Sequence, residues 1–142
     1  MLSQFHDDGF IEASVTGRPL GQITVSGPLN LNLKEQQFPI AIHVMVVQHR
    51  EGEHGPNTAK VAKGVLVINE GAATDEWRLT LTEDVAGDLK DGDARGIAVA
   101  VVPAKGLFAY DTFTWCEHIK LKVRPATVSA VDGEAGVGVD SA

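Results

Sequence analysis

The amino-acid sequence predicts an all-β fold, an antiparallel β-sandwich of about seven or eight strands. Apolar and polar residues alternate with a period of two along most of the chain, which is the period of a half-buried strand. Clusters of Gly, Pro, Asn and Asp separate the alternating segments, and no long segment has the spacing of an amphipathic helix. A closed barrel is the alternative, because strand number alone does not distinguish it from a sandwich.

The length of the chain indicates one domain. A chain of 142 residues is large enough to bury a proper core, and 44% hydrophobic residues is typical of a globular protein. We expect residues 1–124 to form a single β-sandwich domain. Residues 125–142 are mostly small and lack a core-forming pattern, so we expect a weakly ordered tail unless another chain holds it.

The first strands are expected at residues 9–15 and 20–35. In the second segment the apolar residues share one parity and the polar residues share the other. A two-residue hairpin at Gly27 and Pro28 would mix the two sets on one face. The preserved parity instead predicts one long strand bent at this pair, on a sheet edge where Pro is tolerated.

The middle of the chain predicts a central strand and two more strands. Residues 38–49 are apolar on both parities, as expected of a strand buried on both faces. Residues 50–60 are polar and predict a loop, and residues 61–69 predict the next strand. Residues 76–82 alternate cleanly, so we expect Trp77, Leu79 and Leu81 to face inward.

The last two strands follow an acidic connection at residues 83–94. In residues 95–102 we expect Ile97, Val99 and Val101 to face inward. The opposite parity, expected outward, comprises Gly96, Ala98, Ala100 and Val102. In the final strand the expected core residues are Phe113, Trp115, Ile119, Leu121 and Val123. Its expected outward residues are Thr112, Thr114, Cys116, His118 and Lys120.

Residues 76–102 resemble the layout of strands E and F in immunoglobulin-like domains. The resemblance is one of architecture, because Ile97, Ala98 and Val99 stand where such domains place Tyr-x-Cys. It implies an immunoglobulin-like architecture and no particular family or activity, so the expected sandwich is immunoglobulin-like or jelly-roll-like.

Charge and composition narrow the expected partners and location. Twelve basic and nineteen acidic residues give a formal net charge of −7, which disfavours nucleic acid and anionic membrane as partners. A single cysteine cannot form an internal disulfide. The first residues lack the basic and apolar regions of a signal peptide. We therefore expect a cytoplasmic protein, or one released without a classical signal peptide.

Cys116 and His118 are the strongest chemical candidates. Both lie on the outward parity, roughly 6.6 Å apart along the strand, and His43 and Met45 have the same relation on the central strand. If the two strands were neighbours, these four side chains would form a ligand set suited to copper. The usual blue-copper arrangement places its ligands on one loop, whereas these lie in mid-strand. We therefore expect no metal or other cofactor and a structural Cys116 without electropositive surroundings.

Other motifs give weaker signals. The sequence contains no nucleotide-binding glycine motif and no G-x-S-x-G motif. His49 and His54 flank charged residues in the expected loop, where a solvated role is simpler than a zinc site. The acidic connection leaves weak calcium binding open, although its spacing fits no EF-hand. Its acidic residues are Glu83, Asp84, Asp88, Asp91 and Asp93.

The expected outward face of the central strand and the last two strands is small and mostly apolar. Soluble monomers rarely expose a large contiguous apolar patch, so we expect a partner to cover it. This predicts a non-catalytic binding or assembly module that engages another protein or itself, with any small ligand unknown. The alternative is a metal-binding protein or enzyme built on Cys116, His118, His43 and Met45. The expected partner-binding residues are Ala41, Met45, Val47, Ala98, Ala100, Val102, Thr112 and Thr114.

Overall fold

The computed structural model describes residues 5–28, 38–52, 55–69, 75–104 and 109–126. These residues form seven strands and no helix, which confirms the all-β class. The strands are β1 (Asp8–Ala13), β2 (Pro19–Pro28), β3 (Ile40–Gly52), β4 (Gly55–Ile68), β5 (Glu76–Glu83), β6 (Gly92–Pro103) and β7 (Tyr110–Pro125). They close into a barrel in the order β1-β2-β5-β4-β3-β6-β7, so the barrel alternative is the observed arrangement.

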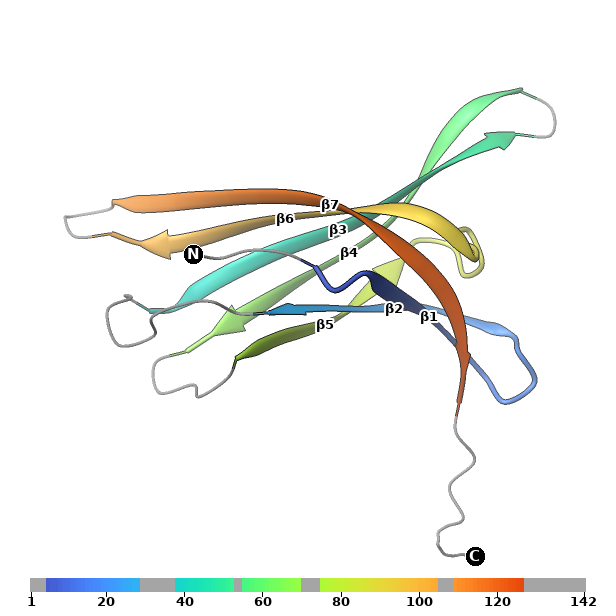
Figure 1. The fold of residues 1–142 in the computed structure, drawn as a ribbon, viewed down its shortest axis with the longest axis horizontal. Coiled ribbons are helices and arrows are strands. Elements are labelled where there is room, and N and C mark those ends of the chain that lie inside the picture. The colour runs from blue at the N-terminus through green and yellow to red at the C-terminus, as the bar shows by residue number, and fades with distance from the viewer. Residues whose placement is uncertain (1–4, 29–37, 53–54, 70–74, 105–108, 127–142) are drawn as a thin grey trace, which may run out of the picture.

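The barrel is closed by the β1–β7 and β4–β5 pairings, which differ in their number of paired positions. β1 and β7 pair in parallel over six positions, from Asp8↔Lys120 to Ala13↔Pro125. Among the described residues, β4 and β5 pair antiparallel at two positions, Ala62↔Glu83 and Lys63↔Thr82. The remaining neighbours are antiparallel, and the long strands β7, β6, β3 and β4 extend well beyond the shorter β1, β2 and β5 (Figure 1). The strands therefore close into one barrel and do not form the predicted sandwich of two sheets. Alternation within strands could not distinguish the two folds, because it does not specify which outer strands pair.

The barrel interior is filled by aliphatic side chains around an aromatic pair. The rings of Phe5 and Trp77 meet edge to face, with centroids 5.1 Å apart and an interplanar angle of 81°. Gly27 lies opposite Trp77 in the β2–β5 ladder. A Cβ on Gly96 would lie 2.8 Å from the Phe5 ring, so β6 must have a glycine where Phe5 crosses it. Phe5 thus occupies the space that a β6 side chain would otherwise fill.

The orientation predicted for β6 is wrong. The expected outward residues Gly96, Ala98, Ala100 and Val102 are buried in the barrel. The larger Ile97, Val99 and Val101 are partly exposed on its outer surface. Both parities of β6 are apolar, so hydrophobicity does not determine which face of the strand points inward. Side-chain volume determines it, because the inner side has room only for small residues beside Phe5.

Other predictions on strand faces have mixed outcomes. Trp77 and Leu81 of β5 and Ile119 and Leu121 of β7 are buried as expected. Phe113, expected in the core, is 42% exposed, because β1 pairs with β7 only from Lys120 onward. The remaining expected β7 core residues, Val123 and Trp115, are exposed and half-buried respectively.

Two segments differ from their expected extents. Residues 50–60, expected as a loop, belong largely to a long β3–β4 hairpin, since β3 ends at Gly52 and β4 begins at Gly55. β2 ends at Pro28, so the strand expected to continue past this residue lies outside the described residues, as does the tail from residue 127.

The acidic connection between β5 and β6 is held by two buried polar side chains. The Glu83 carboxylate accepts the N–H of Leu89 at 2.7 Å and that of Gly87 at 3.4 Å. Gln48 of β3 accepts the N–H of Lys90 at 2.9 Å and donates to the carbonyl of the same residue at 2.8 Å. These bonds use the buried polar groups to fix the backbone of the connection against the barrel.

Candidate functional site

The outer surface of β3, β4 and β6 is a sheet face with mostly apolar side chains. The ladders align residues of β4, β3 and β6 in rows across this face, for example Val65, His43 and Val99. Val65 and Val67 are each 51% exposed, although large aliphatic side chains are usually buried. We call this surface the outer apolar face and define it as Ala41, His43, Met45, Val47, Val61, Lys63, Val65, Val67, Ile97, Val99 and Val101.

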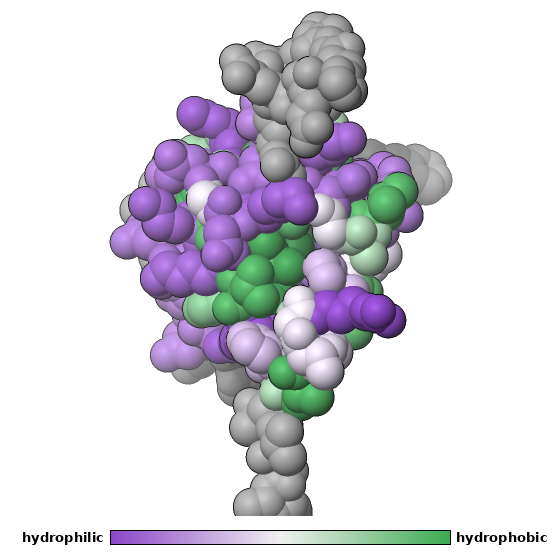
Figure 2. Space-filling model, turned by 90° about the vertical axis from the view of Figure 1, so that its right-hand side faces the viewer, coloured by the Kyte–Doolittle hydropathy of each residue, from purple (hydrophilic) through white to green (hydrophobic). Residues whose placement is uncertain are grey.

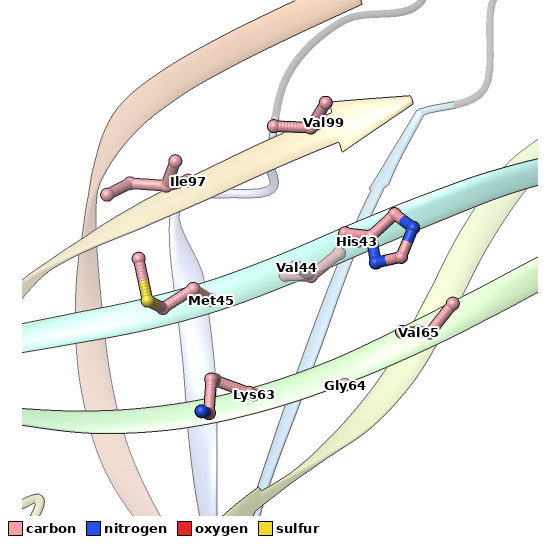
Figure 3. A pocket seen from close by; sticks show the side chains of 8 residues that line it. All are labelled: His43, Val44, Met45, Lys63, Gly64, Val65, Ile97 and Val99. Carbon is pink, nitrogen blue, oxygen red and sulfur yellow. The ribbon is translucent and has the colours of Figure 1, made fainter. Parts of the chain in front are cut away.

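A groove of about 400 Å³ lies between two of these rows. Figure 3 shows its lining side chains on three adjacent strands, with the Val44 and Gly64 positions between the two rows. The polar groups in the lining come from His43 and Lys63. The other lining side chains are those of Met45, Val65, Ile97 and Val99. The groove is within the size range of small-ligand sites, but its few polar groups do not converge on one point.

A second cavity, of about 300 Å³, opens where the β5–β6 connection meets β1 and β7. These elements lie at the right of Figure 1, and on that side hydrophobic residues gather mainly near the centre of a hydrophilic surface (Figure 2). Lys90 and Asp91 contribute charge directly to the cavity lining. The remaining lining residues are Ile11, Pro19, Gly87, Leu89 and Val123. The apolar area is therefore more interrupted here than on the outer apolar face.

The predicted metal-ligand pairs do not meet. β6 lies between β3 and β7, so Met45 and Cys116 both pair with Ile97 from opposite sides. Two strand spacings, about 10 Å, therefore separate the two donor pairs. Within the described ranges, no group of three or more His, Cys, Asp or Glu side chains is arranged to hold a metal ion.

Cys116 and His118 have separate partners. Cys116 is an exposed free thiol, and Nη1 of Arg95 donates to its Sγ at 3.5 Å. Cys116 therefore has one cationic neighbour, Arg95, whereas the sequence predicted no electropositive surroundings. His118 Nε2 lies 3.2 Å from Oδ1 of Asp93, which Lys120 Nζ approaches to 3.8 Å. The two residues thus take part in different surface interactions and do not form a nucleophile–base pair.

The other chemical candidates lie apart. His49 is exposed on β3, and His54 falls outside the described residues. Glu83 bonds backbone N–H groups inside the connection, whereas Asp84 and Asp91 are exposed. The structure gives these acidic side chains no common centre among the residues it describes.

The predicted partner-binding residues divide into two groups. Ala41, Met45 and Val47 lie on the outer apolar face, and Thr112 and Thr114 continue its rows on β7. The other three predicted members, Ala98, Ala100 and Val102, lie inside the barrel and cannot contact a partner there.

The outer apolar face also contains residues that the sequence analysis did not identify. Val61, Val65 and Val67 of β4 and the outward residues of β6 were not expected on it. The sequence contained a usable signal, because β3, β4 and β6 are apolar on both parities and the interior of one barrel cannot hold both sets of side chains.

A search against family models, curated proteins and solved structures finds no match to this chain. No helix among the described residues is long and apolar enough to cross a membrane.

Proposed function

We propose that this chain is a non-catalytic binding or assembly module that engages a protein partner, or a second copy of itself, through the outer apolar face. The observation that supports this proposal is the contiguous set of partly exposed aliphatic side chains on β3, β4 and β6. A contiguous apolar surface is typical of an interaction site in a folded protein.

The shape and charge of the face suit contact with another protein. The adjacent strands β4, β3 and β6 place Val65, His43 and Val99 in one row, and a second sheet packs on such a surface at about 10 Å. Lys63 and Arg95 contribute charge within and beside it. An apolar centre with charged residues nearer the margin is the usual composition of a protein interface. A self-complementary contact of this face would give a two-fold dimer.

A metal protein or enzyme is the second candidate function and has less support. It would need Cys116, His118, His43 and Met45 to act at one point, whereas β6 separates them. Catalytic sites also require a base and an orienting group within hydrogen-bond reach of the nucleophile. The contacts of Cys116 and His118 with Arg95 and Asp93 do not supply such a set.

The mass of the chain in solution tests the proposal. Val99→Arg places a charge on the outer apolar face, beside His43 of the central strand, and Thr80→Arg places one at an exposed position of β5. We expect light scattering behind a sizing column to show an oligomer whose mass falls with Val99→Arg and is unchanged by Thr80→Arg. A monomeric native chain would exclude self-association through this face. An oligomer that Val99→Arg leaves intact would place its interface elsewhere.

A further inference from the structure

Within the part of the chain that the structure describes, half of β7 has a neighbouring strand on one side only. β6 pairs with β7 continuously from Tyr110↔Pro103 to Leu121↔Gly92. On the other side β1 begins to pair only at Lys120. Before β1, the N–H of His6 donates to the Ser26 carbonyl at 2.8 Å and the N–H of Phe5 to the Glu117 side chain at 3.1 Å, so neither N–H bonds the β7 backbone. Among the described residues, no strand therefore lies beside residues 110–116, which extend outward with β6 (Figure 1).

The register shows which backbone groups point toward this open edge. The N–H of Lys120 donates to the Asp7 carbonyl at 2.8 Å, so even-numbered residues direct their N–H and C=O groups away from β6. The β6–β7 register has no shift, so the same alternation applies back to Tyr110. Tyr110, Thr112, Thr114 and Cys116 therefore present their backbone groups at the open edge.

The composition of the open edge favours strand addition. Residues 110–116 contain β-branched and aromatic residues, one acidic residue, Asp111, and no Lys, Arg or Pro. Proteins usually protect exposed edges with such charged residues, prolines or bulges. In β7 the basic residues Lys120, Lys122 and Arg124 instead lie where β1 already pairs with the strand.

We propose that residues 110–116 of β7 pair antiparallel with the same segment of a second copy, about a two-fold axis at Phe113. Thr112 then lies opposite the partner's Thr114, and Asp111 opposite the partner's Trp115, so no like charges face one another. An axis at Thr114 would place Asp111 opposite the partner's Glu117. The Glu117 carboxylate already accepts the Phe5 N–H at 3.1 Å, which fills the space beside it.

The β7 pairing and the proposed function use different surfaces. The new contact uses the backbone at one edge of the sheet and leaves the outer apolar face of each copy open. Thr114→Pro and Val99→Arg therefore test the two proposals separately. The even-numbered position of Thr114 makes this possible, because proline there removes an N–H that faces the edge and no N–H that bonds β6.

The first experiment compares Thr114→Pro with Thr114→Val, which keeps the N–H, by light scattering and analytical ultracentrifugation. Each copy loses one edge hydrogen bond in the proline variant, so we expect the dimer dissociation constant to rise by about 30-fold. Thr114→Val should remain dimeric. A monomeric native chain at about 100 µM, or a dimer that Thr114→Pro leaves unchanged, would overturn the proposal. A dimer lost only with Val99→Arg would assign the contact to the outer apolar face.

The second experiment does not depend on the stability of the proline variant. Phe113→Cys, combined with Cys116→Ser, places two thiols opposite one another across the axis. Directly opposed residues at a non-hydrogen-bonded antiparallel position have Cα atoms about 4.5 Å apart, which suits a disulfide. We expect rapid formation of a covalent dimer on mild oxidation. The control is Thr80→Cys with Cys116→Ser, also exposed, which should remain uncrosslinked. Equal cross-linking of the two variants would overturn the β7 pairing.

Discussion

The outer surfaces of the two halves of the barrel differ in composition. Where β2 pairs with β5, the outward residues are mainly polar and pair across the ladder, as Gln22 does with Thr82 and Ser26 with Arg78. On β3, β4 and β6 the corresponding positions are mainly aliphatic. The surface of β2 and β5 is typical of a sheet face in contact with solvent. The surface of β3, β4 and β6 is typical of a sheet face that packs against another layer. Strict alternation therefore specifies an orientation, whereas a strand that is apolar on both parities does not.

The largest expected effect on the free energy of unfolding is the difference between substitutions on the inner and outer faces of β6. Ala100 of β6 is 0% exposed, so Ala100→Arg buries a charge without a partner and should cost more than about 4 kcal/mol, preventing stable folding. Val99→Arg, at the next residue on the outer face, should change the free energy of unfolding by less than about 1 kcal/mol. Urea denaturation followed by circular dichroism measures both. A stable Ala100→Arg variant would mean that β6 faces the other way.

The two tryptophans give the next largest contrast. Trp77 is 1% exposed and packs on Phe5, so Trp77→Ala should cost about 3–5 kcal/mol. Trp115 is half-buried, and its enclosed Nε1 has no hydrogen-bond partner among the described residues. Trp115→Ala should therefore cost less, about 1–3 kcal/mol. Equal losses in chemical denaturation would contradict the difference in burial.

A smaller effect concerns the ion pair that joins β1 to β7. Burial raises the pKa of Glu12, but hydrogen bonds from Arg124 and Thr24 and the Arg124 charge outweigh it and lower the pKa below its ordinary value of 4.5. The Arg124 guanidinium also lies over the Phe10 ring, 4.5 Å from its centroid. We expect Glu12→Gln to reduce stability at pH 7 by about 1 kcal/mol.

The sign of the pH dependence follows from the lowered pKa. The contribution of Glu12 is present above pH 4.5 and is lost as the pH falls through its folded-state pKa. The difference in stability between native chain and Glu12→Gln should therefore disappear in acid. Glu76→Gln is the control, because the Glu76–Arg78 pair at 2.9 Å is more exposed and should contribute less than about 0.5 kcal/mol. An unchanged difference at acid pH would argue against the ion pair as its cause.

The smallest expected effect is that of Cys116→Ser. The side chain is exposed and accepts a long hydrogen bond from Arg95 at 3.5 Å, so stability should change by less than about 0.5 kcal/mol. Thermal denaturation, together with elemental analysis of the purified native protein, checks this expectation. Loss of a bound metal on substitution would instead support the metal-protein alternative.

The contrast between the two surfaces explains how much of the fold the sequence predicts. The all-β class and the faces of Trp77 and Leu81 follow from alternation and are confirmed. The closure of the barrel depends on pairs such as Asp8↔Lys120, which are far apart in sequence and leave no periodic signal. The orientation of β6 depends on the volume of Phe5, which packs against it from a segment before β1.

The candidate site shows the same division. An apolar outer surface involving Met45 and Val47 follows from the excess of apolar residues in the central strand. The sequence does not predict that β4 contributes to this surface, or which residues of β6 do. Both parities of these strands are apolar, and only packing determines which parity faces outward. The extent to which β1 covers the edge of β7 depends on where β1 begins, which alternation does not encode.

The parallel pairing of β1 with β7 also has a consequence for synthesis on the ribosome. The first strand finds its second neighbour only when the seventh has left the exit tunnel, so the barrel cannot close during translation of β2 to β6. The β1–β2 and β3–β4 hairpins join neighbours in the chain and can form before β7 emerges, since short loops close quickly. Until β7 is complete, the nascent chain exposes the unpaired edges of β1 and β6. Unpaired strand edges make folding intermediates prone to aggregation, so this is the interval in which chaperone binding would matter most.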